Sequence, residues 1–413
     1  MGHGGADNQD NGITSVSEVL LTEAIYECHI MVVEDSQTSR DNIESILRGA
    51  GYQNLSFACD GVEAISKVSG MTFDLDLMIL DIVMPRLDGF KVCGWMRSKP
   101  EFQSLPILVQ TALNEPEQRV SVFGVGATDM VSKPINEAEL LARVKIHLEN
   151  KLLVGGLKSF HERVESELDM ARHMQSAILP SPEFTNRIEK HHNLTISSHF
   201  EPSSELGGDF WGITDLSDGK VAVFMVDFSG HGVTAALNTF RLHALIQSHT
   251  QDVEDPAAYM KSLNAKVCPL LPTHQYATML YGIIDTEQDV FTYAAAASPA
   301  PIFGHDRSPT ISSGDGSGFF LGSFPDSEYE NRSVPFAPGS FLMIHSDALT
   351  EAPCENAPFG IEESGVIELL EQHLANGKSD TLLRDLLIDF YSVATLPLPD
   401  DLTALFAYRG KTD

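Results

Sequence analysis

The stretch that decides the fold of the C-terminal half of the chain reads Val226-Asp227-Phe228-Ser229-Gly230-His231-Gly232. The apolar run at residues 221–226 predicts a buried strand that ends on the carboxylate of Asp227. A Ser-Gly-His-Gly turn follows, and then a helical pattern that continues to Ile246. This order of strand, turn and helix would hold Asp227 at a sheet edge, with open space before it.

Three further carboxylates stand in comparable positions. Asp209 lies in the sequence Gly-Gly-Asp-Phe-Trp, Asp347 in His-Ser-Asp-Ala-Leu-Thr-Glu, and Asp400 in Asp-Asp-Leu-Thr. Oxygen ligands of this kind suit hard divalent cations such as Mg²⁺ and Mn²⁺. The four acidic strand ends therefore predict an oxygen-only metal site.

The charge balance limits the classes of partner. The chain has 413 residues, with 58 acidic and 27 basic side chains and a formal net charge of −31. Nucleic acid binding needs clusters of Lys and Arg for the phosphates, so this balance argues against a direct nucleic acid partner. It suits a protein that binds cations. The length favours two or three domains.

Cysteine spacing and apolar runs favour a cytoplasmic protein. None of the five cysteines belongs to a Cys-x-x-Cys pair, so neither a zinc cage nor a disulfide framework is expected. We find no signal peptide pattern and no apolar run of about 18 residues, so we expect no membrane span. Residues 1–26 begin with a segment rich in Gly, Asn, Asp and Ser and are expected to form a disordered tail.

Residues 27–150 alternate apolar runs with helical patterns. Five strand–helix units in this length predict a doubly wound α/β domain with a five-stranded parallel sheet. The expected strands are 29–33, 55–57, 77–80, 105–109 and 130–131. Sheets of this type carry their sites at the carboxyl ends of the strands. Polar residues stand at those ends here: Glu34, Asp35, Asp81, Thr111 and Lys133.

The motifs of this region resemble those of a two-component receiver domain. They are Val32–Ser36, Asp81–Gly89, Thr111-Ala112 and Ser132-Lys133-Pro134. The resemblance implies that Asp81 accepts a phosphoryl group from a sensor histidine kinase or a phosphotransfer protein. It implies an Mg²⁺ ion with these ligands: Glu34, Asp35, Asp81 and the carbonyl of Val83. Thr111 and Lys133 would then bind the phosphoryl oxygens.

Residues 151–180 form the expected linker. Its apolar residues from Leu157 to Ile178 recur every three or four residues, close to the period of about 3.5 that coiled coils use. Gly155-Gly156 is expected to break or hinge this helix at its start. Two arrangements fit the pattern: a helix packed on its own domain, or a parallel coiled coil that joins two chains as a homodimer.

Residues 181–413 combine alternating strand patterns with helical ones. Strands are expected at 194–199, 221–226, 277–284, 290–295, 341–345 and 404–408. Helices are expected at 234–248, 256–267, 360–373 and 379–392. This is an α+β pattern in which two stacked sheets are flanked by helices.

The motifs of this region resemble the metal-dependent protein phosphatase (PPM) family, in its bacterial SpoIIE-type branch. They are Ala171–Pro180, Gly207–Trp211, Asp227–Gly232, His345–Glu351 and Asp400–Thr403. The resemblance implies an αββα sandwich that holds two Mn²⁺ or Mg²⁺ ions. Asp227 would bridge the ions beside the Phe228 carbonyl. The other implied ligands are Asp209, Asp347 and Asp400, with Asp401 as the alternative to Asp400.

Three positions depart from these family patterns. Met130 stands where receivers carry an aromatic switch residue, three positions before the lysine. Ala348 replaces the glycine of a Ser-Asp-Gly motif, and Ala297-Ser298-Pro299 replaces a frequent Gly-His-x-Pro turn. His231 has two interpretations, a helix-start residue with local hydrogen bonds or a general acid, and we favour the first.

The sequence therefore predicts a cytoplasmic response regulator with a phosphatase output. Two metal ions would activate a water that attacks phosphorus without a covalent phosphoenzyme. The branch resemblance suggests a phosphorylated STAS-domain anti-sigma-factor antagonist as substrate, in a partner-switching pathway controlled by phosphorylation at Asp81. The alternative is a non-enzymatic adaptor that binds a sigma factor or its regulator when phosphorylated. The aspartate set favours the enzyme.

Overall fold

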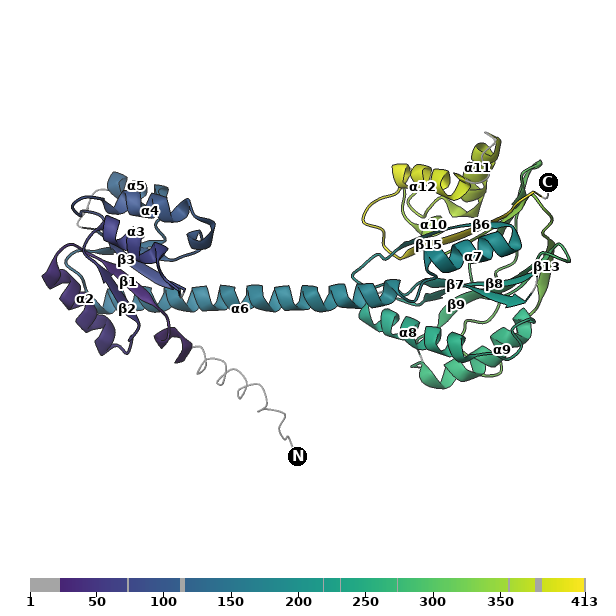
Figure 1. Ribbon diagram of the computed structural model, residues 1–413, viewed down its shortest axis with the longest axis horizontal. Coiled ribbons are helices and arrows are strands. Elements are labelled where there is room, and N and C mark those ends of the chain that lie inside the picture. The colour runs from purple at the N-terminus through teal and green to yellow at the C-terminus, as the bar shows by residue number, and fades with distance from the viewer. Residues whose placement is uncertain are drawn as a thin grey trace, which may run out of the picture. The chain divides into compact units, whose positions relative to one another are not determined.

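The computed structural model describes residues 23–72, 74–111, 116–217, 219–230, 232–272, 274–355, 357–375 and 381–411. The chain divides into two compact units, the first ending at Val164 and the second beginning at Glu165 (Figure 1). Most of the expected tail, Ala112 and His231 lie outside the described residues. Residues 23–26, which we placed in the disordered tail, are helical instead, because Ile25 packs into the core of the first unit.

The first unit is built on five parallel strands in the order β2-β1-β3-β4-β5. The strands are β1 (Ile30–Val33), β2 (Leu55–Ala58), β3 (Leu77–Asp81), β4 (Ile107–Thr111) and β5 (Asp129–Ser132). The helices are α2 (Gln37–Gly49), α3 (Gly61–Ser69), α4 (Gly89–Arg97), the short η1 (Pro100–Phe102), α5 (Pro116–Gly124) and α6 (Glu137–Ser176). The prediction of a doubly wound parallel sheet is confirmed.

Helices cover both faces of this sheet. One apolar cluster joins the strands to α2 and to the first turns of α6 through Ile43, Leu47, Leu140, Val144 and Leu148. A second cluster joins the other face to α3, α4 and α5 through Ala64, Val68, Val92, Met96 and Val122. Every residue of β3 is buried, as expected for a central strand covered on both sides. Because all five strands are parallel, their polar carboxyl ends meet at one edge of the sheet.

The second unit contains two sheets of five strands each, in the orders β13-β10-β9-β8-β7 and β12-β11-β14-β15-β6. The strands of the first sheet are β7 (Phe210–Ser217), β8 (Lys220–Phe228), β9 (Ala277–Asp285), β10 (Val290–Ala296) and β13 (Arg332–Pro335). Those of the second sheet are β6 (Leu194–Glu201), β11 (Ile302–His305), β12 (Ser308–Ser313), β14 (Ser340–His345) and β15 (Leu402–Arg409).

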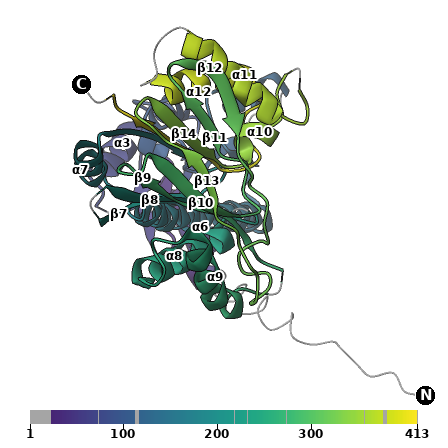
Figure 2. The same cartoon turned by 90° about the vertical axis from the view of Figure 1, so that its right-hand side faces the viewer.

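The helices of this unit are α7 (Pro182–His192), α8 (Val233–Ser248), α9 (Pro256–Val267), η2 (Cys268–Leu270), α10 (Ala348–Glu351), α11 (Glu362–Ala375) and α12 (Leu382–Val393). Helices α8 and α9 lie outside the first sheet, and α11 and α12 outside the second (Figure 1 and Figure 2). Side chains of both sheets share one core, which includes Val223, Met225, Leu342 and Leu405. This is the predicted αββα sandwich.

Among the described residues, none of the helices has the length and apolar character that a membrane span requires.

Helix α6 runs without interruption from Glu137 to Ser176. The break or hinge predicted at Gly155-Gly156 is therefore wrong for this structure. The helix accepts both glycines because each is exposed and because a Cβ added at either would meet nothing within 4 Å. A glycine in a helix interior costs roughly 1 kcal/mol relative to alanine, so this pair is a weak point in a continuous helix.

We predict that the double substitution Gly155→Ala and Gly156→Ala stiffens this part of α6. The alanines remove backbone freedom from the unfolded segment and meet no clash. Hydrogen–deuterium exchange of peptides covering residues 150–160 should slow by roughly fivefold or more, the factor that corresponds to about 1 kcal/mol. The control Gly124→Ala, also without a close neighbour, should leave these peptides unchanged. Equal or faster exchange in the double variant would contradict the continuous helix.

Candidate functional site

The antiparallel strands of the second unit bring the predicted carboxylates together. Phe210 of β7 pairs with Val226 of β8, so the next residues outward, Asp209 and Asp227, are neighbours across the two strands. In the other sheet, Asp347 lies two residues after the end of β14 and directly before α10, and Asp400 lies two residues before the start of β15. Four separate parts of the sequence thus reach one edge of the sandwich.

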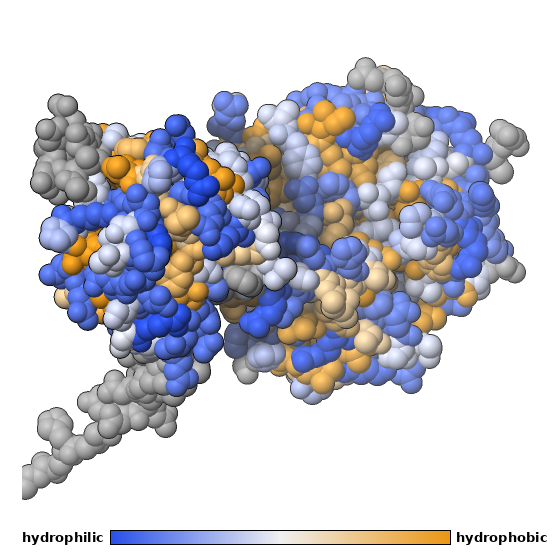
Figure 3. Space-filling view, turned by 60° about the vertical axis from the view of Figure 1, so that its left-hand side comes forward, coloured by the Kyte–Doolittle hydropathy of each residue, from blue (hydrophilic) through white to orange (hydrophobic). Residues whose placement is uncertain are grey.

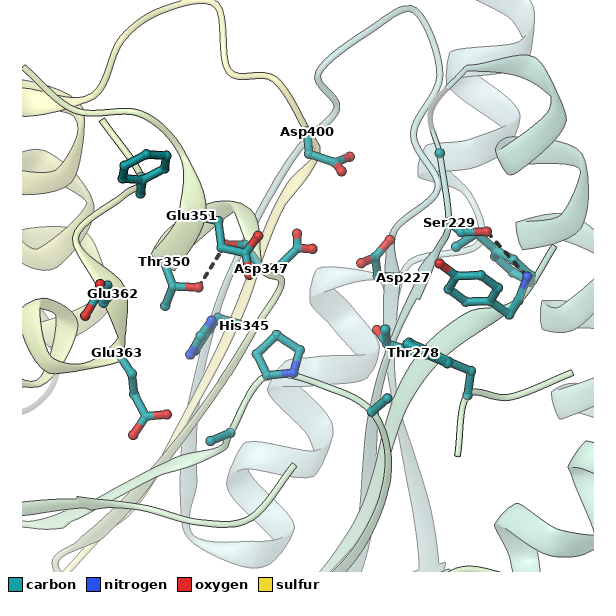
Figure 4. A pocket seen from close by; sticks show the side chains of 18 of the residues that line it. Asp227, Ser229, Thr278, His345, Asp347, Thr350, Glu351, Glu362, Glu363 and Asp400 are labelled. Carbon is teal, nitrogen blue, oxygen red and sulfur yellow. Dashed lines mark hydrogen bonds between the residues drawn. The ribbon is translucent and has the colours of Figure 1, made fainter. Parts of the chain in front are cut away.

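Asp227, Asp347 and Asp400 line an open cavity of about 900 Å³. Figure 4 shows Asp227 on one side of this cavity, facing Asp347 and Asp400 on the other. Phe228 also lines the cavity, as does Thr278, the residue of β9 that pairs with Asp227. No Lys or Arg occurs among the described residues of the lining.

Asp209 lies behind this cavity instead of lining it. Its side chain is almost fully buried, and its Oδ2 atom has no hydrogen-bond partner among the described residues. Burial, followed by the nearby carboxylates of Asp227 and Asp401, raises the pKa of Asp209 well above its usual range. An orphaned buried carboxylate oxygen beside another carboxylate is the arrangement that a cation would satisfy.

The choice between Asp400 and Asp401 can be addressed by geometry. The Asp401 carboxylate is buried and accepts hydrogen bonds from the backbone nitrogens of Ser203 (2.6 Å) and Gly208, and from Ser203 Oγ (2.9 Å). A Cβ at Gly207 would lie 2.7 Å from Asp401 Oδ2, so the turn needs glycine there. Asp401 thus holds the turn that leads to Asp209, whereas Asp400 reaches the cavity.

The carboxylates facing the cavity are electrostatically strained. Burial, and then Asp347, raise the pKa of Asp227 to about 7; a hydrogen bond with Asp209 opposes the shift. Burial, and then Asp400 and Glu351, raise the pKa of Asp347 to about 6. Bringing these negative charges together costs free energy, which a divalent cation would offset. The residues present therefore fit the implied metal ions.

The first unit gathers its polar strand ends in the same way. Lys133 Nζ donates hydrogen bonds to Glu34 Oε2 at 2.8 Å and to Asp81 Oδ2 at 2.7 Å. Ligand oxygens of Glu34, Asp35 and Asp81 lie within 4.8 Å of one another, as an Mg²⁺ site requires. Burial lowers the pKa of Lys133, but its hydrogen bonds to the two carboxylates outweigh that effect and raise it.

The remaining receiver residues also lie at this edge. Thr111 is buried at the end of β4, and its carbonyl accepts the backbone N–H of Lys133 at 2.9 Å. The backbone N–H of Val83 donates to Asp81 Oδ1 at 3.3 Å. Met130, at the position where receivers carry an aromatic residue, is half-buried against the apolar cluster of α3, α4 and α5.

Comparison with known families agrees with this geometry. The model named "Response regulator receiver domain" matches residues 30–145. The model named "Stage II sporulation protein E (SpoIIE)" matches residues 217–409. The chain joins a receiver domain to a SpoIIE-type phosphatase domain.

Individual relatives match one domain or the other. The receiver domain is 36% identical over 120 residues to the transcriptional regulatory protein YvrH of Bacillus subtilis, covering 29% of this chain and 48% of YvrH. The phosphoserine phosphatase RsbP of Bacillus subtilis is 26% identical over 198 residues, which are 47% of each chain. The chain thus spans about half the length of these relatives. The solved SiaA-PP2C domain of Pseudomonas aeruginosa superposes with a TM-score of 0.53 at 21% identity, covering 61% of this chain and 98% of that one, and so shares the fold.

Sequence reasoning missed several residues of the SpoIIE-type cavity. His345 is buried on its wall (Figure 4). Its Nδ1 lies 2.9 Å from the Ser346 carbonyl, which can only accept, so Nδ1 carries the proton and Nε2 is left as an acceptor without a partner among the described residues. Glu351, Glu362 and Glu363 also line the cavity. His345 and Glu351 lie within the motif that identified Asp347, which is the signal that could have found them.

The departures from the family patterns are accommodated locally. Ala348 is the first residue of α10, and its methyl group packs in the core between the second sheet and its helices. Ala297 lines the cavity with a positive φ of 50°, a conformation that glycine adopts at lower cost. The cavity wall therefore carries mild backbone strain at Ala297.

We predict that, in a chelator, Asp227→Asn stabilises the SpoIIE-type domain near neutral pH. Folding raises the pKa of Asp227 from 3.8 to about 7, so the folded domain binds a proton that the unfolded chain has lost. The stability of the wild type should therefore fall, relative to the variant, as the pH rises from about 4 to about 7. At pH 7 the variant should melt on the order of 5 °C higher.

Circular dichroism melts at several pH values, with and without excess Mn²⁺, measure this effect. Mn²⁺ should reverse the order of the two melting temperatures, because the ion stabilises only the intact carboxylate set. A melting difference that stays constant across the pH range would rule out the repulsion inferred at Asp227.

Proposed function

We propose that this chain is a response regulator in which phosphorylation of Asp81 controls a metal-dependent serine/threonine phosphoprotein phosphatase. The observation that carries the proposal is the convergence of Asp227, Asp347 and Asp400 on a cavity whose described lining contains no Lys or Arg. Carboxylates that repel one another in this way favour the binding of cations. A protein that acts only as an adaptor would have no use for such a set. The name of the relative RsbP, a phosphoserine phosphatase, supports the same class of substrate.

The residues of the two domains would have different roles in the reaction. Two Mn²⁺ or Mg²⁺ ions, when bound, would lower the pKa of a shared water and neutralise phosphoryl oxygens. Asp227 and the Phe228 carbonyl would hold these ions from the first sheet, and Asp209 would support Asp227 from behind. Asp347 and Asp400 would complete the set from the second sheet. In the receiver domain, Mg²⁺ at Glu34, Asp35, Asp81 and Val83 would serve phosphorylation, and Thr111 and Lys133 would bind the product.

The proposed substrate is the phosphorylated STAS-domain antagonist of an anti-sigma factor. Removing its phosphate would free the antagonist to bind the anti-sigma factor, which is a partner switch. The proposed phosphodonor is a sensor histidine kinase or a phosphotransfer protein. The adaptor alternative predicts phosphorylation-dependent binding without any metal-dependent release of phosphate.

The deciding experiment measures release of phosphate from a phosphorylated STAS-domain protein in Mn²⁺. The substitutions Asp227→Asn and Asp347→Asn should each lower the rate by more than about a hundredfold, because even the outer-shell partners of metal ligands affect metal affinity or activity by 10–100-fold. Glu183→Gln, an exposed carboxylate on α7, is the matched control and should retain the full rate. Full activity in both aspartate variants would refute the metal mechanism.

Receiver chemistry generates a separate prediction. Asp81→Ala should abolish labelling by acetyl phosphate, because the acceptor carboxylate is gone, whereas Thr111→Ala should keep the label and weaken its effect on phosphatase output. Acid-labile, hydroxylamine-sensitive label is measured on the purified protein. Persistent label in the Asp81 variant would move the acceptor to another residue.

We further propose that α6 transmits the state of Asp81, in a homodimer joined through this helix. Large apolar residues from the middle of this helix to its end are exposed: Leu153, Val154, Leu157, Phe160, Met170 and Met174. At its end, Gln175 Nε2 donates to the Gly207 carbonyl at 2.6 Å, and Gln175 Oε1 accepts from the Gly207 N–H at 3.1 Å. A shift of the helix would therefore act directly on the turn that precedes Asp209.

Phosphorylation adds roughly −1.5 to −2 charges at the receiver, and we expect it to raise the phosphatase activity.

The test replaces Leu157, Val164 and Leu168 with Ser. The triple variant should sediment as a monomer, because it loses the apolar stripe, and its phosphate release should no longer respond to beryllofluoride, a phosphoryl mimic. The control replaces the exposed polar residues Lys158, Glu162 and Glu165 with Ser and should behave as wild type. If the apolar variant responds fully, α6 is a passive tether.

A further inference from the structure

Four aromatic rings form an exposed surface beside the cavity of the SpoIIE-type domain. We call Tyr276, Phe319, Phe320 and Phe324 the aromatic surface. Tyr276 directly precedes β9, and the other three belong to the segment between β12 and β13. Phe319 and Phe324 are 56% and 62% exposed, although such side chains usually lie in the core. The chain leaves this apolar area in contact with solvent.

The aromatic surface consists of two ring pairs, one of which lines the cavity. Tyr276 and Phe320 both line the cavity, and their ring centroids lie 4.4 Å apart. Phe319 and Phe324 contact each other edge to face, with centroids 5.9 Å apart. Two backbone hydrogen bonds between Ala277 and Leu321, of 3.0 and 2.9 Å, tie the two segments together. The backbone beside Tyr276 and Phe320 is therefore fixed within the domain itself.

The cavity itself offers a phosphoryl group little besides the implied metal ions. Its described lining contains no Lys or Arg, and Glu351, Glu362 and Glu363 add negative charge (Figure 4). Among charged groups, a phosphoserine or phosphothreonine side chain would be attracted by the ions and repelled by these glutamates; the hydroxyls of Ser229, Thr278 and Thr350 offer neutral donors only. Contacts outside the cavity, made by groups that flank the phosphorylated residue, would therefore add to the binding free energy.

We propose that the aromatic surface is a docking site for phosphoprotein substrates that carry large apolar side chains next to the phosphorylated residue. The inference rests on the proposed phosphatase function. A phosphorylated side chain in the cavity brings its flanking residues over Tyr276 and Phe320, and from there over Phe319 and Phe324. The acidic glutamates disfavour polyanionic substrates such as nucleotides, which carry charge where this surface is apolar.

Exposure alone would not distinguish this surface. Hydrophobic residues are scattered over the face drawn in Figure 3, and Val62, Phe123 and Ile388 are also exposed. None of these three lines the cavity. The aromatic surface differs because it begins inside the site where the chemistry is proposed. Aromatic residues at the centre of interfaces often dominate binding, so their removal commonly weakens it tenfold or more.

The test uses two short synthetic phosphoserine peptides of equal charge, with Leu on both sides of the phosphoserine in one and Ser in the other. The protein is the full chain with Mn²⁺, as wild type and as the double variant Phe319→Ser, Phe324→Ser. These two rings do not line the cavity, so p-nitrophenyl phosphate should be hydrolysed at the same rate by both proteins. Ile388→Ser, which removes an exposed apolar side chain on α12, is the matched control.

For the wild type and the control, we expect kcat/KM and the affinity for the fluorescein-labelled peptide to be about tenfold higher with Leu than with Ser. In the double variant the ratio should fall to about one. A wild type without this preference, or a double variant that keeps it, would overturn the proposal. The proposal would also be overturned if the double variant lost a dimer that the wild type forms in sedimentation but kept the preference for the Leu peptide. The aromatic surface would then join two copies of the chain. If p-nitrophenyl phosphate is not hydrolysed at all, the proposed phosphatase function fails, and peptide binding still decides the docking site.

Discussion

Repulsion among buried and half-buried carboxylates is the constraint on which the second domain depends. Asp227 and Asp347 approach across the cavity, and Asp209 is buried behind them, so each has a raised pKa. Only a rigid frame can hold such groups together without their partner ion. Two five-stranded sheets with a common core supply that frame. The hydrogen bonds that Asp401 accepts from Ser203 and Gly208 fix the turn that leads to Asp209.

The receiver domain meets the same electrostatic problem with a different solution. Glu34 and Asp81 are neutralised in part by Lys133, a cation that the chain itself supplies. The cavity of the SpoIIE-type domain has no Lys or Arg in its described lining, so the implied divalent ions would have to offset its carboxylates. The two domains thus differ in the source of the compensating positive charge.

Much of this architecture could be read from the sequence, because the motifs stand where strands end. Buried runs such as Leu77–Leu80 and Val221–Val226 fixed the strands, and the carboxylates that follow them fixed the sites. Features that depend on distant contacts could not be read. The segment between β12 and β13 has no periodic pattern, yet its pairing with Ala277 builds the aromatic surface. Gly155 suggested a hinge because propensity was judged without the surrounding helix, which continues through it.

The Gln175 side chain gives the linker helix a physical means of acting on the site. Its amide makes two hydrogen bonds with the backbone of Gly207, and Gly208 in turn donates to Asp401. The next residue is Asp209, whose carboxylate lies beside Asp227. A rotation or displacement of α6 that exceeds the tolerance of these hydrogen bonds must either break them or move this turn, and buried amides left without partners cost about 1–3 kcal/mol each. Moving the turn is the cheaper response wherever the turn can adapt, and it changes the position of a proposed metal ligand without any contact between α6 and the cavity.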